Sequence, residues 1–330
     1  APGQYASGEM RDEALLSGHH GGDPERHVEQ GMGGLMLGIT VTPPEGWRPN
    51  EAKRRENRLF VVSDSLAGER RRFGYVLAGA DGEPPVGSVR WPGSTIVAWK
   101  GEATSVTVIN RSPEPTQIHW HGLEIDSYYD GVVGFGGHPG SLTPAIMPAD
   151  SFEMRITPPR AGSFMYHTHV NDIRQQSAGL YGGFVVLEEG QAWDPEHDYV
   201  VLLSTNNDPD MSLLLNGTRE PDPLVLTAGD TYRFRIMNIT LFNGGRVRLV
   251  RDGYPVRWRA LAKDGADLPP HQRTVDFADR IVNVGETADF EWSAPEEAAE
   301  LVLELRSREG DLFVAQPVRV EAPGAGADAR

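Results

Sequence analysis

Two pairs of histidines are the residues of this chain that point most directly to chemistry. His119 and His121 are separated by one residue, and so are His167 and His169. On a β-strand, residues i and i+2 face the same side, so each pair presents two imidazoles from one face. Neutral imidazole is a good ligand for copper, zinc and iron. If the two strands are neighbours, four imidazoles converge, and the pattern predicts a metal site.

Other chemistries find less support in the sequence. A buried, hydrogen-bonded histidine is the common alternative for a single His-x-His motif, but two such pairs in strand-like segments favour metal binding. A zinc hydrolase would be expected to carry a mixed histidine and carboxylate site. The chain has no Gly-x-Ser-x-Gly nucleophile motif, no P-loop and no Gly-x-Gly-x-x-Gly sequence opening a helix.

Composition limits the class of protein. The 330 residues, 39% hydrophobic and 24% charged, predict a soluble globular chain of two domains with room for part of a third. The formal net charge of −16 disfavours binding to nucleic acid or to an anionic membrane. No run approaches the roughly 18 apolar residues that a membrane helix needs. Cysteine is absent, which excludes disulfides, thiolate metal sites and a cysteine nucleophile.

From residue 58 onward, the sequence pattern predicts β structure. Short runs rich in Val, Ile, Phe and Thr alternate with Gly, Pro, Asp and Asn, and no helical period of convincing length interrupts them. This pattern predicts an all-β fold built as an antiparallel sandwich. The predicted strands of this first part are 58–63, 73–77, 94–99, 104–110, 117–125, 151–157, 162–169 and 183–188.

A second series of predicted strands begins near residue 198. Its His197 and His271 stand apart, beside loop residues, and we expect both at the surface. Residues 92–110 and 223–238 share one pattern, which indicates a distant repeat. In each, a strand is followed by a turn of Gly and an acidic residue, and then by an alternating strand that ends in Asn. The copy without paired histidines is expected to act as scaffold. The predicted strands are 199–204, 213–217, 223–226, 231–238, 246–251, 280–284, 288–292, 300–306 and 313–320.

With the histidine pairs placed on strands, the motifs resemble those of multicopper oxidases, the laccase-like family built from cupredoxin domains. Residues 117–123, with the sequence Gln-Ile-His-Trp-His-Gly-Leu, resemble the first copper motif of that family. Residues 158–169, ending in Tyr-His-Thr-His, resemble the second. Residues 128–132 and 175–183 resemble the segments that follow the first motif and close such a domain. The likeness covers roughly residues 58–320.

The resemblance implies roles for the paired residues. In that family two such pairs supply half the ligands of a trinuclear copper cluster. By resemblance, His119 would bind the type 2 copper, and His121, His167 and His169 would bind the type 3 pair. Asp130 matches an acidic residue that relays protons near the cluster, although a turn residue before glycine is an open alternative. A carboxylate with a suitable pKa can manage the protons of oxygen reduction.

The N-terminal part resembles the end of a type 1 copper domain. By resemblance, His27 and Met32 are the candidate ligands there, followed by a last strand ending near residue 41. A type 1 site takes two histidines, a cysteine and a weak axial methionine. Since the chain has no cysteine, it cannot complete a type 1 copper site alone. The other four histidines of the cluster are missing too.

Three explanations for this departure stay open. The chain could be the C-terminal piece of a longer or cleaved oxidase whose upstream part carries the cysteine and the missing histidines. The copper site could instead have decayed, leaving a non-catalytic copper-binding relative. Finally, residues 1–42 could only look like a copper loop, with His27 and Met32 as ordinary surface and core residues.

The sequence thus predicts an all-β chain with two cupredoxin-like Greek-key β-sandwich domains and an N-terminal remnant of a third. We expect a multicopper oxidase subunit or fragment outside the cytoplasm, periplasmic or secreted, that oxidises a phenolic or metal-ion reductant and reduces O2 to water. Its expected partner is an upstream cupredoxin chain or domain, or a second copy. The predicted organisation begins with a type 1 remnant at 1–42 and a linker at 43–57. A copper domain at 58–190 and a domain without copper motifs at 191–320 follow, and a disordered tail at 321–330 ends the chain.

Overall fold

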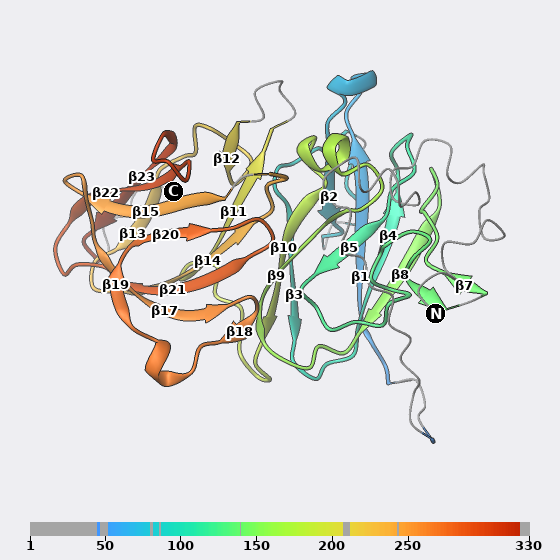
Figure 1. Ribbon diagram of the computed structural model, residues 1–330, viewed down its shortest axis with the longest axis horizontal. Coiled ribbons are helices and arrows are strands. Elements are labelled where there is room, and N and C mark those ends of the chain that lie inside the picture. Colours follow the sequence, from blue (N-terminus) through green and yellow to red (C-terminus); the bar gives the residue numbers. More distant parts are fainter. Residues whose placement is uncertain are drawn as a thin grey trace.

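Two β-sandwiches lie side by side in the computed structural model, one coloured blue to green and the other yellow to red (Figure 1). The structure describes residues 45–46, 52–79, 82–85, 87–138, 140–206, 212–242 and 244–323. Residues 1–42, assigned above to a type 1 remnant, lie outside the described residues. No helix in the described part of the chain combines the length and the apolar character needed to cross a membrane.

The first sandwich consists of two four-stranded sheets, with strand orders β2-β1-β4-β8 and β3-β10-β9-β5. Its strands alternate in burial, as in β8, where Phe152, Met154 and Ile156 are buried and the residues between them are not. The elements are β1 (Arg55–Ser63), η3 (Gly68–Arg70), β2 (Phe73–Leu77), β3 (Gly93–Trp99), β4 (Thr104–Asn110), β5 (Ile118–His121), β6 (Gly137–His138), β7 (Ser141–Leu142), β8 (Ser151–Ile156), β9 (Gly162–Thr168), η4 (Asp172–Gln176) and β10 (Tyr181–Leu187).

The second sandwich has the sheet orders β12-β11-β14-β21-β17-β18 and β13-β23-β22-β15-β16, with β19 paired to β17 and β20 paired to β15. Its elements are β11 (Asp198–Thr205), β12 (Leu213–Leu215), β13 (Leu224–Thr227), β14 (Thr231–Asn238), β15 (Gly245–Arg251), β16 (Tyr254–Pro255), β17 (Arg257–Lys263), β18 (Ala266–Asp267), η5 (Pro270–Gln272), β19 (Val275–Phe277), β20 (Asp279–Val282), β21 (Thr287–Ser293), β22 (Ala299–Arg306) and β23 (Leu312–Glu321).

The predicted repeat is visible in the pairing of the strands. In the first sandwich β1 pairs with β4 and β3 with β10, both in parallel, and in the second β11 pairs with β14 and β13 with β23, again in parallel. The predicted sandwich fold is confirmed, but these four pairs are parallel and not antiparallel. The chain crosses from one sheet to the other before it returns, so strands that are not consecutive meet with the same direction.

Each sandwich has its own core, and a third cluster joins them. Met165 of β9 and Tyr181 of β10 pack with Leu202 of β11 and with Met237 and Ile239, at and beyond the end of β14. Because neighbouring residues of a strand face opposite sides, one face of β9 belongs to the core of the first sandwich and the other meets the second sandwich.

A buried polar network crosses the same boundary between the sandwiches. The hydroxyl of Ser163 on β9 donates to Asp289 on β21 at 2.8 Å, and Arg235 on β14 donates to Ser163 at 2.9 Å. All three side chains are almost fully buried. Since buried polar groups are stable only when they are paired, this network holds the two sandwiches in one orientation.

Element boundaries differ from the prediction in a few places. Strand β1 begins at Arg55, so it includes the last residues of the predicted linker, and Glu321 of the predicted tail is the last residue of β23. Strands β16 to β19 were missed because their charged and aromatic residues lack a clear apolar alternation. At residues 254–277, β17, β18 and β19 extend one sheet of the second sandwich, and β16 extends the other by pairing with β15.

Candidate metal centre

Strands β5 and β9 bring three of the four paired histidines onto one face of a sheet. In their antiparallel pairing His119 is directly opposite His167, and His121 lies two residues along β5 from His119. Trp120 and Tyr166 point to the other face and are buried in the core of the first sandwich. The large aromatic residues thereby anchor the strands, and the imidazoles are left on the outer face.

The four imidazoles lie in one place. One ring nitrogen from each of His119, His121 and His167 lies within 4.8 Å of the others. The ring centroid of His169, just beyond the end of β9, is 5.5 Å from that of His119 and 6.1 Å from that of His167. Among the residues that the structure describes, this is the only group of three or more metal-ligating side chains with donor atoms so close together.

The surroundings of His167 and His121 favour their neutral rings. Burial, followed by the neighbouring imidazoles, holds the pKa of His167 well below its ordinary value. Burial and the nearby His119 also lower the pKa of His121. The Nδ1 of His167 donates to the carbonyl oxygen of Thr168 at 2.8 Å, which leaves the lone pair on Nε2. This neutral form with one fixed tautomer is the form in which imidazole binds a metal.

Asp130 lies directly beside His119. The Nδ1 of His119 donates to the backbone carbonyl of Asp130 at 2.9 Å, and a carboxylate oxygen of Asp130 is 3.3 Å from the same nitrogen. Burial opposes protonation of His119, but these contacts with Asp130 outweigh it and raise its pKa. Gly131 permits this approach, because it has a φ of +82° and a Cβ there would lie 1.6 Å from the carbonyl oxygen of Ile118.

The second sandwich supplies a large part of the pocket around the histidines, although the sequence analysis assigned it only a scaffold role. The pocket has a volume of about 300 Å³. On the first sandwich its lining includes Asp172 and Gln176, which sequence reasoning missed. Gln176 donates to the carbonyl of Ile239 at 2.5 Å and thus ties the two sides together. The lining residues of the second sandwich are Asn238, Ile239, Thr240, Leu241, Phe242, Val284 and Gly285.

The remaining predicted residues lie elsewhere. His27 and Met32, the candidate type 1 ligands, are outside the described residues. His197 is partly exposed between Asp194 and Asp230, with ring nitrogens 2.9 and 3.4 Å from their carboxylates. His271 is exposed in η5. The prediction that these two histidines belong to the surface is confirmed.

The repeat places an ion-pair network where the first sandwich has histidines. Strands β15 and β22 pair with each other as β5 and β9 do, and each pair lies at the corresponding place in its sheet. On β15 and β22, Arg248 is opposite Glu304, and Arg246 is opposite Arg306. Glu304 accepts hydrogen bonds from Arg248 at 3.0 Å and from Arg306 at 2.8 Å. The same architecture therefore carries clustered histidines in one copy and paired charges in the other.

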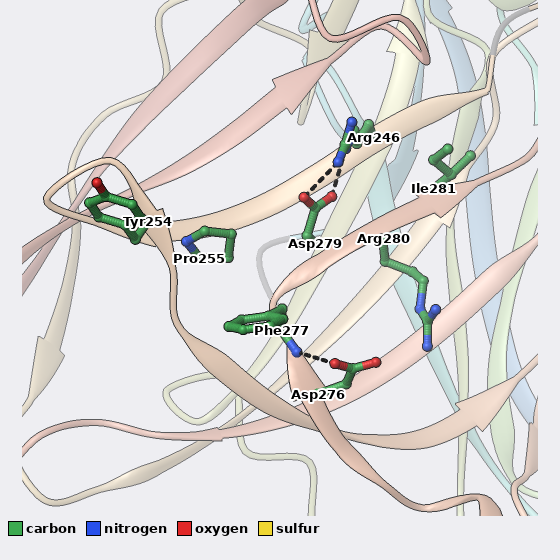
Figure 2. Close-up of a pocket in the computed structure, with 8 residues that line it drawn as sticks. All are labelled: Arg246, Tyr254, Pro255, Asp276, Phe277, Asp279, Arg280 and Ile281. Carbon is green, nitrogen blue, oxygen red and sulfur yellow. Dashed lines mark hydrogen bonds and ion pairs between the residues drawn. The ribbon is translucent and has the colours of Figure 1, made fainter.

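A larger hollow of about 750 Å³ lies on the second sandwich (Figure 2). Tyr254, Pro255 and Phe277 form its apolar side, and Arg246 makes two hydrogen bonds to Asp279, at 2.6 and 2.7 Å. No histidine lines this hollow. It therefore lacks the donor set of the smaller pocket, which remains the candidate metal centre.

Comparison with known proteins finds relatives of the domain that carries the histidines. A family model for multicopper oxidases matches residues 87–191. Copper resistance protein A of Escherichia coli is 30% identical over 122 residues, which cover 36% of this chain and 19% of that protein. L-ascorbate oxidase of Nicotiana tabacum is 31% identical over 174 residues, covering 48% of this chain and 29% of that protein. The chain thus spans less than a third of the length of these curated relatives.

Solved structures support the fold over a longer part of the chain. A multicopper oxidase from Pseudomonas thermotolerans superposes with a TM-score of 0.60 at 22% identity, covering 82% of this chain and 64% of that one. A blue copper oxidase from Nitrosomonas europaea gives 0.61 at 20% identity, covering 82% and 86%. At these identities the likeness establishes the fold, and both sandwiches are cupredoxin-like.

Proposed function

We propose that this chain, whose residues 87–191 match a family model for multicopper oxidases, carries half of a trinuclear copper cluster of a laccase-like oxidase. His119 is the proposed type 2 ligand, and His121, His167 and His169 are the proposed type 3 ligands. The four histidines proposed to bind the cluster all lie in the domain at 58–190, and the domain at 191–320 packs beside it.

The observation that carries the proposal is the convergence of four imidazoles on one pocket, with three donor nitrogens within 4.8 Å of one another. The chemistry of these donors fits copper, because imidazole is a ligand that copper binds well and the absence of cysteine rules out a thiolate site. Neutral, hydrogen-bonded rings such as that of His167 need not lose a proton before they bind.

Copper held by such a cluster supplies the one-electron steps that together reduce dioxygen to two waters with four electrons and four protons. The residues of this chain would bind the metal and handle protons. Asp130 is the proposed proton relay, because its carboxylate stands 3.3 Å from Nδ1 of His119, and His119 lines the pocket. A positioned carboxylate of this kind can take up and release a proton during the reaction.

We infer that a second module covers the pocket. Three large apolar side chains at its rim are exposed, Ile173 by 43%, Phe242 by 56% and Val284 by 45%. An apolar rim around a cluster of polar ligands is typical of a surface that is buried in an assembly. The proposed partner is a cysteine-containing cupredoxin module, from an upstream part or another chain, that brings the missing histidines and the type 1 site. A second copy of this chain could bring histidines but no cysteine.

Two further features belong to the proposal. The electron donor is a phenolic compound or a metal ion, and the protein works outside the cytoplasm, in the periplasm or after secretion. The support is the likeness to a copper resistance protein and to an ascorbate oxidase. Residues 1–42 are proposed to be the last loop and strand of the type 1 domain, with His27 and Met32 as ligands.

Loading with copper tests the proposal. The chain is incubated with cupric chloride, alone and together with a cysteine-bearing cupredoxin domain of a multicopper oxidase, and dialysed. Copper per chain, blue absorption and oxygen consumption with a phenolic or cuprous donor are then measured. We expect the chain alone to hold copper without blue colour, and the reconstituted pair to be blue and to consume oxygen.

The possible results separate the two function classes. Copper bound by the chain, with neither colour nor oxygen consumption in the reconstituted pair, would assign the protein to non-catalytic copper binding. A chain that retains no copper after dialysis would overturn the proposal altogether.

A further inference from the structure

A glycine of the second sandwich lies against one of the proposed copper ligands. Gly285 is in the turn between β20 and β21 and has a φ of +79°. A Cβ at this position would lie 3.1 Å from Nε2 and 3.2 Å from Cε1 of His121. These separations are tighter than ordinary van der Waals contact, so the backbone of Gly285 forms one wall of the space that the His121 ring occupies.

The turn that carries Gly285 is held firmly in place. The amide of Gly285 donates to the carbonyl of Asn238 at 2.9 Å, and the amide of Asn238 donates to the carbonyl of Glu286 at 3.0 Å. The side chain of Asn238 is fully buried and donates to the carbonyl of Val282 at 2.7 Å. Because both ends of the turn are bonded to β14, Gly285 cannot move away from His121 without breaking buried hydrogen bonds.

A second contact ties the segment after His121 to the same sandwich. Arg160 donates to the carbonyl of Gly122 at 3.2 Å and to the carboxylate of Glu124 at 2.6 Å. Its guanidinium also donates to the carbonyl of Gly265, in the second sandwich. The backbone next to His121 is therefore also linked to the neighbouring domain through Arg160.

We propose that Gly285 is a positioning residue for His121, so that the second sandwich sets the metal affinity of a half-site whose four histidines all belong to the first. The inference rests on the proposed function, since it takes His121 to be a copper ligand. A ligand ring that is free to rotate must be ordered when the metal binds, whereas a ring confined by a rigid wall is already in place. A side chain at position 285 would push the ring out of that place.

Gly285→Ala tests the proposal, with Gly253→Ala as its matched control. Gly253 lies in the same sandwich with a φ of +81°, and a Cβ there would meet nothing within 4 Å. Both variants therefore place an alanine in the same strained backbone region, and only Gly285→Ala brings a methyl group against His121. The affinity for Cu²⁺ is measured by competition with a chromophoric chelator, and the melting temperature is recorded for each variant.

We expect Gly285→Ala to weaken Cu²⁺ binding about 10- to 100-fold, the range typical of groups that orient a metal ligand. Gly253→Ala should bind copper as the parent chain does, and its melting temperature should fall about as much as that of Gly285→Ala. In a His121→Ala background, Gly285→Ala should have no further effect on copper affinity, because the ring that it displaces is gone. Equal affinities for the two glycine variants, or an undiminished loss in the His121→Ala background, would overturn the proposal.

Arg160→Gln provides a second test that does not depend on whether Gly285→Ala folds. This variant releases the segment after His121 from Gly265 and leaves every proposed ligand unchanged. We expect weaker copper binding with an unchanged β fold, and full affinity would count against control by the second sandwich. A parent chain that binds no copper would instead refute the proposed function, so the two failures are distinguishable.

Discussion

His119 and His167 are directly opposite each other in the pairing of β5 with β9, and their ring centroids lie 5.3 Å apart. Residues that face each other across antiparallel strands have Cβ atoms about 5 Å apart, so this register alone brings the two rings within reach of one small metal cluster. A shift of one residue would turn one histidine pair into the core. The strand register is therefore the feature on which the metal centre depends.

Removal of His167 should abolish most copper binding. The His167 ring is 5.3, 5.9 and 6.1 Å from the rings of His119, His121 and His169, and the residue is only 8% exposed. We expect His167→Ala to lower copper per chain sharply, as measured by elemental analysis after dialysis, with an unchanged far-UV circular dichroism spectrum. His271→Ala, at an exposed position, serves as control and should keep the copper content of the parent. Equal copper in the two variants would contradict the ligand assignment.

Asp130→Asn should slow the assembled oxidase and leave its copper in place. The amide keeps the shape of the carboxylate but cannot accept a proton, so we expect oxygen consumption to fall by about 100-fold or more. Asp126→Asn is the matched control, since Asp126 lies in the same loop and its side chain accepts only the amide of Tyr128 among the bonds described. A normal rate for Asp130→Asn would rule out the relay and leave Asp130 as a turn residue that orients His119.

The apolar rim predicts where a partner module docks. Phe242 is 56% exposed at the mouth of the pocket, and we expect Phe242→Ser to weaken assembly with a cysteine-bearing cupredoxin module by about 2 kcal/mol, which is roughly 30-fold. Titration calorimetry measures this affinity. Tyr254→Ser is the control, because Tyr254 is 78% exposed but lines the other hollow, away from the histidines. Similar losses for both variants would argue against a docking surface centred on the pocket.

Stability should depend on pH through Glu304. Hydrogen bonds from Arg306, together with the charges of Arg306 and Arg248, hold the pKa of Glu304 below its ordinary value of 4.5. A lowered pKa in the folded state means that the ionised form stabilises the fold above pH 4.5, and that this stability is lost as the pH falls through the folded-state pKa. We expect Glu304→Gln to lower the free energy of unfolding at neutral pH by about 1 to 2 kcal/mol, and by much less in acid.

Urea denaturation at neutral and at acid pH measures this difference. Glu300→Gln is the matched control on the same strand, because the Glu300 side chain is 77% exposed and lies 3.9 Å from Arg319. It should change stability little at either pH. A loss for Glu304→Gln that stays constant with pH would show that packing, rather than ionisation, accounts for the contribution of Glu304.

Much of the fold and half of the site follow from local patterns in the sequence. The alternation of apolar residues predicted β2, β4 and β14 with the observed ends, and most other strands to within two residues. The spacing of His119 and His121, and of His167 and His169, predicted that each pair shares a face. These properties are local, because the two-residue period of a strand is the same in every β protein.

The sequence by itself determined most of the strands and which imidazoles of each pair point together. Only the tertiary structure decided what surrounds those imidazoles, including Ile239, Phe242 and Gly285 from the second sandwich. Nothing in the residues near position 285 indicates contact with His121. The contact arises because the buried surfaces of β9, β10, β11 and β14 pack in one orientation. That orientation is set by the shape complementarity and paired charges of distant segments, which no local period records.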